Sequence, residues 1–247
     1  MFFSNAAHIW NDIVDKRLDA QNPRTRTRPI PRGAISIPRA LIFCTTQALL
    51  AASCFNLFPL AYGGIYAAPN IVATAYYPFS KRHTNYPQFV LGFCIAYGVV
   101  VGALAMGKVP ATARGGGFSV NPELLSLFFA IFFWTVIFDT VYAHLDVHSD
   151  VLMGVGSTAV RFRNCAKRFL STHLFCMICA LVMLGVGGNL GVAYYFFAVG
   201  GSLLSLGLLL LRVDLENRGS CWWWFGTGFW YTAGAVLTGL LMEYVLA

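Results

Sequence analysis

Two short acidic motifs carry the residue types in this chain that are best suited to chemistry, and more than a hundred residues separate them. The first consists of Asn11, Asp15 and Asp19, and the second of Asp146 and Asp150. On a helix the first three residues share one face, because they are spaced at i, i+4 and i+8. The second motif repeats this spacing. The segments containing these motifs hold five of the ten acidic residues of the protein.

Opposed carboxylates repel one another unless cations lie between them. Oxygen ligands select hard cations, and Mg²⁺ in particular is held by one or two carboxylates together with substrate phosphates. The two motifs therefore predict a diphosphate substrate. The alternative interpretation of either motif alone is a solvated loop or an acidic helix end. The occurrence of two copies favours a site, as does the run of cations after the first motif, which consists of Arg24, Arg26, Arg28 and Arg32.

Composition places the chain in a membrane. Hydrophobic residues make up 57% of the sequence and charged residues 11%, whereas soluble domains carry roughly a quarter charged residues. Seven apolar runs have about the 20 residues that a membrane-spanning helix needs, and residues Met1–Trp10 resemble the tail of a further helix. We expect one polytopic membrane domain over residues 1–247. The seven runs are Ile37–Leu57, Leu60–Phe79, Phe89–Gly107, Pro122–Tyr142, Phe169–Val186, Gly191–Leu211 and Phe225–Leu246.

The distribution of charge gives an independent test of these spans, because alternate loops must lie on the same side of a membrane. Fifteen of the 17 Lys and Arg residues fall in one set of alternate loops with their helix ends, and only Lys108 and Arg114 do not. By the positive-inside rule this side is cytosolic, or faces the matrix of a mitochondrion. The net charge of +7 then needs no nucleic acid as partner. The loops are 11–39, 80–88, 144–168 and 212–224.

Other motifs are less specific. His144 and His148 flank Asp146 and either belong to the site or are polar neighbours at a helix end. Cys176 and Cys179 form a single CxxC pair in an apolar helix, where small core residues are expected. Residues Gly115 to Gly117 predict a flexible loop on the opposite face.

Longer segments around these motifs resemble a known family. The resemblance is to the UbiA superfamily of membrane aromatic prenyltransferases, in particular its 4-hydroxybenzoate polyprenyltransferase branch and fungal enzymes of meroterpenoid formation. It implies an all-α integral membrane bundle around a central cavity, here with about seven full transmembrane helices and one partial N-terminal helix. The segments that carry the resemblance are NDIVDKRLD, TRTRPIPRGAIS, YYPFSKRHTNYPQFVLGF and FDTVYAHLDVHSDVLMGVGSTAVRF.

The resemblance also implies roles for individual residues. The acidic residues of the two motifs are implied to be catalytic and, with the motif asparagine, to hold Mg²⁺ and through it the prenyl diphosphate. A second set is implied to contact the diphosphate. The Mg²⁺ ligands are Asn11, Asp15, Asp19, Asp146 and Asp150, and the diphosphate-binding residues are Arg28, Tyr77, Lys81, Arg82 and Asp139.

The implied activity is the Mg²⁺-dependent transfer of a polyprenyl group, expected to be farnesyl, from its diphosphate to an aromatic phenolic acid. A carbon–carbon bond would form, in meroterpenoid secondary metabolism. The alternative is the 4-hydroxybenzoate polyprenyltransferase of ubiquinone formation, and a further alternative is a transporter or an inactive truncated membrane protein. The partners are then the two substrates and the lipid bilayer, in an endomembrane or the mitochondrial inner membrane.

The sequence departs from the family pattern at several places. Ser4 occupies a position where relatives have arginine, and Gly156 one where they have lysine. Nine helices are usual, so the first helix and most of the second are expected to be missing. Residues Phe2–Trp10 would supply only about 15 Å of helix. We therefore expect weak activity from residues 1–247, and recovery when about 60 upstream residues are restored, since each span takes about 20 residues plus loops.

Overall fold

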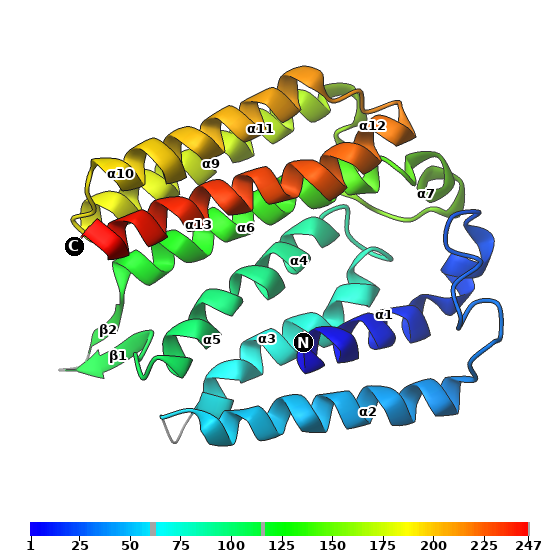
Figure 1. Ribbon diagram of the computed structural model, residues 1–247. Coiled ribbons are helices and arrows are strands. Elements are labelled where there is room, and N and C mark those ends of the chain that lie inside the picture. Colours follow the sequence, from blue (N-terminus) through cyan, green and yellow to red (C-terminus); the bar gives the residue numbers. More distant parts are fainter. Residues whose placement is uncertain (60–62, 115–116, 247) are drawn as a thin grey trace.

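The computed structural model describes residues 1–59, 63–114 and 117–246. Long helices lie side by side, and the loops that join them gather at the two ends of the bundle (Figure 1). The cation-rich segments that precede α2, α4 and α9 meet at one end, called here the cap end. The prediction of an all-α membrane bundle is confirmed.

The first helices form one side of the bundle (Figure 1). Helix α1 continues to Gln21, so the first acidic motif lies within a helix of 20 residues, about 30 Å long. The motif residues lie on a helix, as expected, and this helix continues beyond the apolar segment Phe2–Trp10. Asp15 and Asp19, in the last two turns of α1, are buried. The elements are α1 (Phe2–Gln21), α2 (Ile37–Ser53), the 3₁₀ turn η1 (Cys54–Leu57), α3 (Gly63–Ser80), α4 (Pro87–Ala96) and α5 (Gly98–Ala105).

A small hairpin lies at the end of the bundle opposite the cap. Strand β1 (Ala111–Arg114) pairs antiparallel with β2 (Gly117–Val120), and Ala111 lies opposite Val120. The sequence predicted a flexible loop at residues 115–117, of which 115 and 116 lie outside the described residues. Two strands at the bundle end leave the helical fold class unchanged.

The second half of the chain forms the other side of the bundle. Helix α6 begins with Pro122, and the side chain of Asn121 caps it by accepting a hydrogen bond from the Leu124 amide at 2.8 Å. This arrangement fits the preferences for Asn at the cap and Pro at the first turn. The helices are α6 (Pro122–Ala143), α7 (Val147–Met153), α8 (Thr158–Arg161), the 3₁₀ turn η2 (Arg163–Cys165), α9 (Ala166–Gly187), α10 (Val192–Tyr194), the π segment η3 (Tyr195–Gly200), α11 (Gly201–Arg212), α12 (Arg218–Trp223), the π segment η4 (Trp224–Gly228) and α13 (Phe229–Leu246).

Six of the seven predicted spans correspond, in the described part of the chain, to helices long and apolar enough to cross a membrane. The seventh corresponds to α3, which contains Pro69 and Pro78; residues 60–62, at the start of its predicted run, lie outside the described residues. The span predicted from Phe225 begins earlier, at Arg218. The six helices are Ile37–Leu57, Pro87–Ala105, Pro122–Ala143, Arg163–Gly187, Val192–Arg212 and Arg218–Leu246.

The main apolar core lies where α6 packs on α9, and α11 joins it by packing against α9 and α13. Ile137 and Val141 of α6, Leu170 and Leu181 of α9, and Leu209 of α11 are fully buried there. Helix α6 also packs against α4 on its other side, which makes it the central helix of the bundle. Because α6 ends three residues before Asp146, this rigid packing positions the second acidic motif at the cap end.

Candidate functional site

A cavity of about 150 Å³ at the cap end brings the two acidic motifs together. We call it the cap cavity. Its lining comes from α1, the loop after α1, the ends of α3 and α6, the start of α4, and the segment from α7 to α8. Of the ten residues predicted for the site, Asp15 and Arg82 lie beside the cavity rather than on its lining. The eight that line it are Asn11, Asp19, Arg28, Tyr77, Lys81, Asp139, Asp146 and Asp150.

Asp15 is fully buried, and two cations from the end of α3 neutralise it. Lys81 donates to Oδ2 of Asp15 at 2.5 Å, and Nη2 of Arg82 lies 3.4 Å from Oδ1. Arg82 also donates to the carbonyl of Val14 at 2.7 Å, and its guanidinium lies over the Phe79 ring. Lys81 reaches the cavity lining, whereas Arg82 is turned onto α1. Asp15 therefore positions Lys81 at the wall of the cavity.

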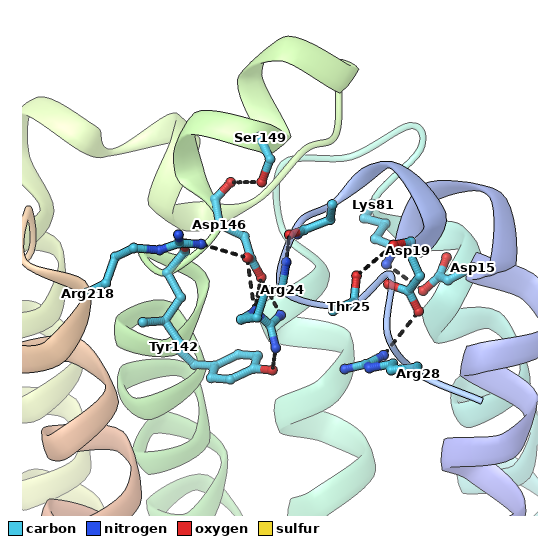
Figure 2. Close-up of polar contacts among 12 residues, drawn as sticks. Asp15, Asp19, Arg24, Thr25, Arg28, Lys81, Tyr142, Asp146, Ser149 and Arg218 are labelled. Carbon is cyan, nitrogen blue, oxygen red and sulfur yellow. Dashed lines mark hydrogen bonds and ion pairs between the residues drawn. The ribbon is translucent and has the colours of Figure 1, made fainter. Parts of the chain in front are cut away.

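Asp19 is paired with an arginine of the loop that follows α1. Nη1 of Arg28 donates to Oδ2 of Asp19 at 3.1 Å and to Oδ1 of Asp12 at 2.9 Å. Thr25 holds the same loop to the helix, because its hydroxyl donates to the Asp19 carbonyl at 3.1 Å. These bonds fold the loop back over α1, so that Arg28 lies beside the motif that precedes it (Figure 2).

Asp146 receives the strongest set of contacts. Nε of Arg24 donates to Oδ1 and Oδ2 of Asp146 at 3.0 and 3.1 Å, and Nη2 of the same guanidinium also contacts Oδ2. Nη1 of Arg24 donates to the Tyr142 hydroxyl at 2.7 Å, and Arg218 lies 3.8 Å from Oδ1 of Asp146 (Figure 2). A bidentate guanidinium is a strong carboxylate partner. Burial acts to raise the pKa of Asp146. The hydrogen bonds from Arg24 and Asn22 outweigh burial and lower this pKa below its usual value.

Asp150 lies one helical turn after Asp146, and the Asp150 amide donates to the Asp146 carbonyl at 2.8 Å. None of the ion pairs among the described residues involves Asp150. Burial, together with the negative charge of Asp146, raises the pKa of Asp150 to about 7. A neighbouring positive charge would favour its ionised form. Asp150 is thus the carboxylate of the cavity that is best prepared to accept an added cation.

A close backbone approach closes one wall of the cavity. The Gly156 amide donates to the Lys81 carbonyl at 2.8 Å. A Cβ atom at position 156 would lie 2.2 Å from the carbonyl oxygen of Thr84, a distance that real Cβ atoms do not adopt. A lysine at this position, expected from the family pattern, would therefore push the α3–α4 turn away. Glycine permits the contact that fixes the backbone of Lys81.

The donor chemistry of the cavity fits a hard divalent cation shared with a phosphate ligand. Asp19, Asp146, Asp150 and Asn11 supply only oxygen donors from side chains, the type that Mg²⁺ prefers. Within the residues that the structure describes, no three His, Cys, Asp or Glu side chains form a ready metal cluster. Basic side chains pair with Asp19 and Asp146. Such a site suits a metal ion for which the bound substrate supplies several of the ligands.

The sequence did not indicate that two further residues belong to the cap cavity. Arg24 was interpreted only as part of a cationic run, and Tyr142 had no assigned role, yet both line the cavity: Arg24 holds Asp146, and the Tyr142 hydroxyl accepts a hydrogen bond from Arg24. The position of Arg24 five residues after Asp19 gives no signal for a partner 122 residues away. His144 and His148 are absent from the lining of the cap cavity and line a second cavity beyond Asp146.

Comparison with known proteins shows a match over almost the whole chain. The model of the UbiA prenyltransferase family matches residues 1–233. The UbiA prenyltransferase claS of Ampulloclitocybe clavipes is 33% identical over 98% of this chain and 74% of its own length. The mitochondrial 4-hydroxybenzoate polyprenyltransferase of Schizosaccharomyces pombe is 32% identical over 98% of this chain and 66% of its own length. The chain thus spans about two thirds to three quarters of these two relatives.

Solved structures share the fold. A UbiA homolog from Aeropyrum pernix in its apo form has a TM-score of 0.82 at 20% identity, over 98% of this chain and 86% of that one. A UbiA homolog from Archaeoglobus fulgidus, bound to GPP and Mg²⁺, has a TM-score of 0.70 at 16% identity, over 98% and 84% of the two chains. At these identities the likeness concerns the fold of the bundle.

Proposed function

Because this chain belongs to the UbiA prenyltransferase family, we propose that it transfers a prenyl group from a prenyl diphosphate to an aromatic acceptor. The cap cavity is the proposed place of the diphosphate. The observation that carries this proposal is the meeting of two acidic motifs and three cationic side chains in one cavity at the end of an apolar bundle. The family membership and the fold support it.

The charge of the cap cavity supports a requirement for Mg²⁺. Four aspartates and only three cationic side chains, Arg24, Arg28 and Lys81, line the cavity. A diphosphate would add further negative charge and would be repelled without an added cation. When bound, Mg²⁺ would supply this charge and polarise the bond to the leaving group. We assign the metal contacts to the residues of the two acidic motifs. Of these, Asn11, Asp19, Asp146 and Asp150 reach the lining.

Substrate binding must rearrange the ion pairs of the cavity. Its volume of about 150 Å³ is below the roughly 300–1,000 Å³ of ligand pockets. In our proposal Lys81 leaves Asp15 and Arg28 leaves Asp19, and both then bind diphosphate oxygens. Arginine and lysine suit this task because their charge complements the phosphate, with arginine adding a bidentate fork. Tyr77 and Asp139 would contact the diphosphate from the membrane side. Arg82, which contacts α1, would support Lys81.

The proposed reaction breaks the allylic carbon–oxygen bond, and both electrons leave with the diphosphate. A ring carbon of the acceptor then forms a bond to the allylic carbon, and the ring hydrogen at that carbon leaves as a proton. Water must be excluded from the allylic carbocation that the bond breakage leaves. Aromatic side chains of α4 and α6 meet below the cap: Phe89 contacts Phe132 with ring centroids 5.7 Å apart, and Phe93 contacts Phe128 at 5.7 Å. We assign to them the wall around the isoprenoid chain.

We further propose a farnesyl donor and a phenolic acid acceptor, in fungal meroterpenoid metabolism. The similarity to fungal prenyltransferases supports this choice. A second candidate is 4-hydroxybenzoate prenylation for ubiquinone, supported by the equal similarity to the mitochondrial enzyme of S. pombe. In both cases the cation-rich cap end would face the cytosol or the matrix.

Membranes containing the chain should be incubated with labelled farnesyl diphosphate, Mg²⁺ and a panel of phenolic acids that includes 4-hydroxybenzoate. The expected result is a labelled, prenylated acid that disappears when EDTA removes the metal. An Asp146→Ala variant, inserted into the same membranes at equal amount, is the control for background transfer. Transfer that persists in EDTA, or in the variant, would refute the proposed site.

A further inference from the structure

A second cavity lies on the outer side of Asp146 and has no part in the proposed reaction. Its volume is about 580 Å³, and we call it the outer cavity. It lies between the segment 144–153 and the α11–α12 loop, and the end of α1 and the residue Arg163 complete it. Its lining includes Leu152, Arg163, Glu216 and Arg218.

The charge of the outer cavity comes mainly from two arginines. Arg163 is exposed, and among the described residues no carboxylate lies within ion-pair distance of it. Arg218 lines the same cavity, and its side chain is 62% exposed. Glu216 is the one carboxylate on the lining, and it is exposed to solvent.

Apolar side chains lie beside these arginines. Leu152 is 87% exposed and belongs to α7, which lies at the cap end (Figure 1). Leu145, Val147 and Met153 belong to the same lining. A cavity with two guanidinium groups and an apolar wall is complementary to a phosphate group with an apolar neighbour, since guanidinium binds phosphate in a bidentate manner.

Arg218 connects the two cavities. Its Nη2 lies 3.8 Å from Oδ1 of Asp146, and its Nε donates to the Leu145 carbonyl at 3.0 Å. We propose that the outer cavity binds a phosphate-bearing anion through Arg163 and Arg218, and that occupancy weakens the contact of Arg218 with Asp146. An anion in the outer cavity would compete with Asp146 for the same guanidinium. The phosphate can belong to a lipid headgroup or to a free ion, because both present the same group.

The test measures binding directly, on the purified full chain in detergent and without Mg²⁺. Inorganic phosphate, a short-chain phosphatidic acid and the corresponding diacylglycerol are titrated in separate calorimetric experiments. Arg163→Gln should weaken binding of the phosphate-bearing probe by at least about tenfold, whereas Arg161→Gln should leave it unchanged. Arg161 is the matched control because it is exposed, lies two residues away and is absent from the lining.

The outcomes separate the two sources of phosphate. Loss of phosphatidic acid binding alone in Arg163→Gln identifies a lipid site, and loss of inorganic phosphate binding as well identifies a site for free phosphate. Arg163→Lys retains the charge and should bind more tightly than Arg163→Gln, which distinguishes lost charge from lost folding. Equal binding by the wild type and Arg163→Gln, binding of diacylglycerol as strong as that of phosphatidic acid, or no binding of either phosphate would overturn the proposal. Anions held by Arg28 and Lys81 in the cap cavity would not respond to Arg163.

Discussion

Arg24 and Asp146 lie 122 residues apart and form a bidentate contact at the cap end, with Nε to carboxylate distances of 3.0 and 3.1 Å. This contact joins the loop after α1 to the start of α7, and so it closes the cap cavity between the two halves of the bundle (Figure 2). In the proposed function it also holds the second acidic motif until the metal and the diphosphate arrive.

Replacing Arg24 tests the structural value of this contact. Arg24→Ala should lower the free energy of unfolding by about 1–3 kcal/mol, because it leaves a largely buried carboxylate with weaker partners. Arg26→Ala is the control, since Arg26 is exposed in the same loop, and it should change stability by less than about 0.5 kcal/mol. Thermal unfolding in detergent compares the two. Equal stability of both variants would show that the contact contributes little.

Replacing Asp146 or Lys81 separates two roles in the proposed reaction. Asp146→Ala, and likewise Asp15→Ala, should abolish Mg²⁺-dependent prenyl transfer while membrane insertion is retained. Lys81→Ala should instead raise the KM for the prenyl diphosphate by roughly tenfold or more, because one of several cations is lost. Steady-state rates at varied prenyl diphosphate give both results. A Lys81→Ala enzyme with unchanged kinetics would remove Lys81 from the diphosphate site.

The raised pKa of Asp150 predicts a dependence of Mg²⁺ binding on pH. With a pKa of about 7, the carboxylate is protonated at pH 6, and the metal must displace that proton. The apparent affinity for Mg²⁺ should therefore weaken as the pH falls below 7, by up to about tenfold per unit. The Mg²⁺ concentration for half-maximal effect, measured at pH 6 and pH 8, checks this. Asp150→Asn cannot titrate and should lose most of the difference, whereas an unchanged difference would assign it to another group.

The raised pKa of Asp150 also predicts how the stability of the metal-free protein changes with pH. Because the folded state raises the pKa of Asp150, its contribution to stability is present below the ordinary pKa near 3.8 and is lost as the pH rises toward 7. Asp146 acts in the opposite direction, since its pKa is lowered, and its contribution is lost only in acid. Thermal unfolding of Asp150→Asn should therefore depend less on pH than that of the wild type between about 4 and 7, the range over which the wild-type contribution is lost.

Gly156 allows a test of the wall that fixes Lys81. Gly156→Ala should destabilise the chain by about 1–3 kcal/mol, because its Cβ would lie 2.2 Å from the Thr84 carbonyl. The displaced turn should also weaken prenyl transfer. Gly102→Ala is the matched control, as a Cβ there meets nothing within 4 Å. A tolerated Gly156→Ala, with stability and activity like those of Gly102→Ala, would contradict the close approach.

The sequence by itself determined the class of the protein and the local geometry of its motifs. Long apolar runs can satisfy their backbone hydrogen bonds in a bilayer only as helices, so the runs from Ile37 and Pro122 predict spans wherever they lie in the bundle. The side-chain spacing of Asn11, Asp15 and Asp19 is likewise a property of one helix. The concentration of cations in alternate loops predicted which end of the bundle carries the site.

Only the tertiary structure decided which charges meet. Lys81 pairs with Asp15 across 66 residues, and Arg24 pairs with Asp146 across 122. Several arginines follow the first motif, and no spacing rule distinguishes Arg24 from its exposed neighbour Arg26. The choice depends on where α6 places Asp146 relative to the folded loop after α1, and that position is set by packing between distant segments. The close approach at Gly156 arises in the same way, because it depends on a backbone contact with the α3–α4 turn that no local pattern encodes.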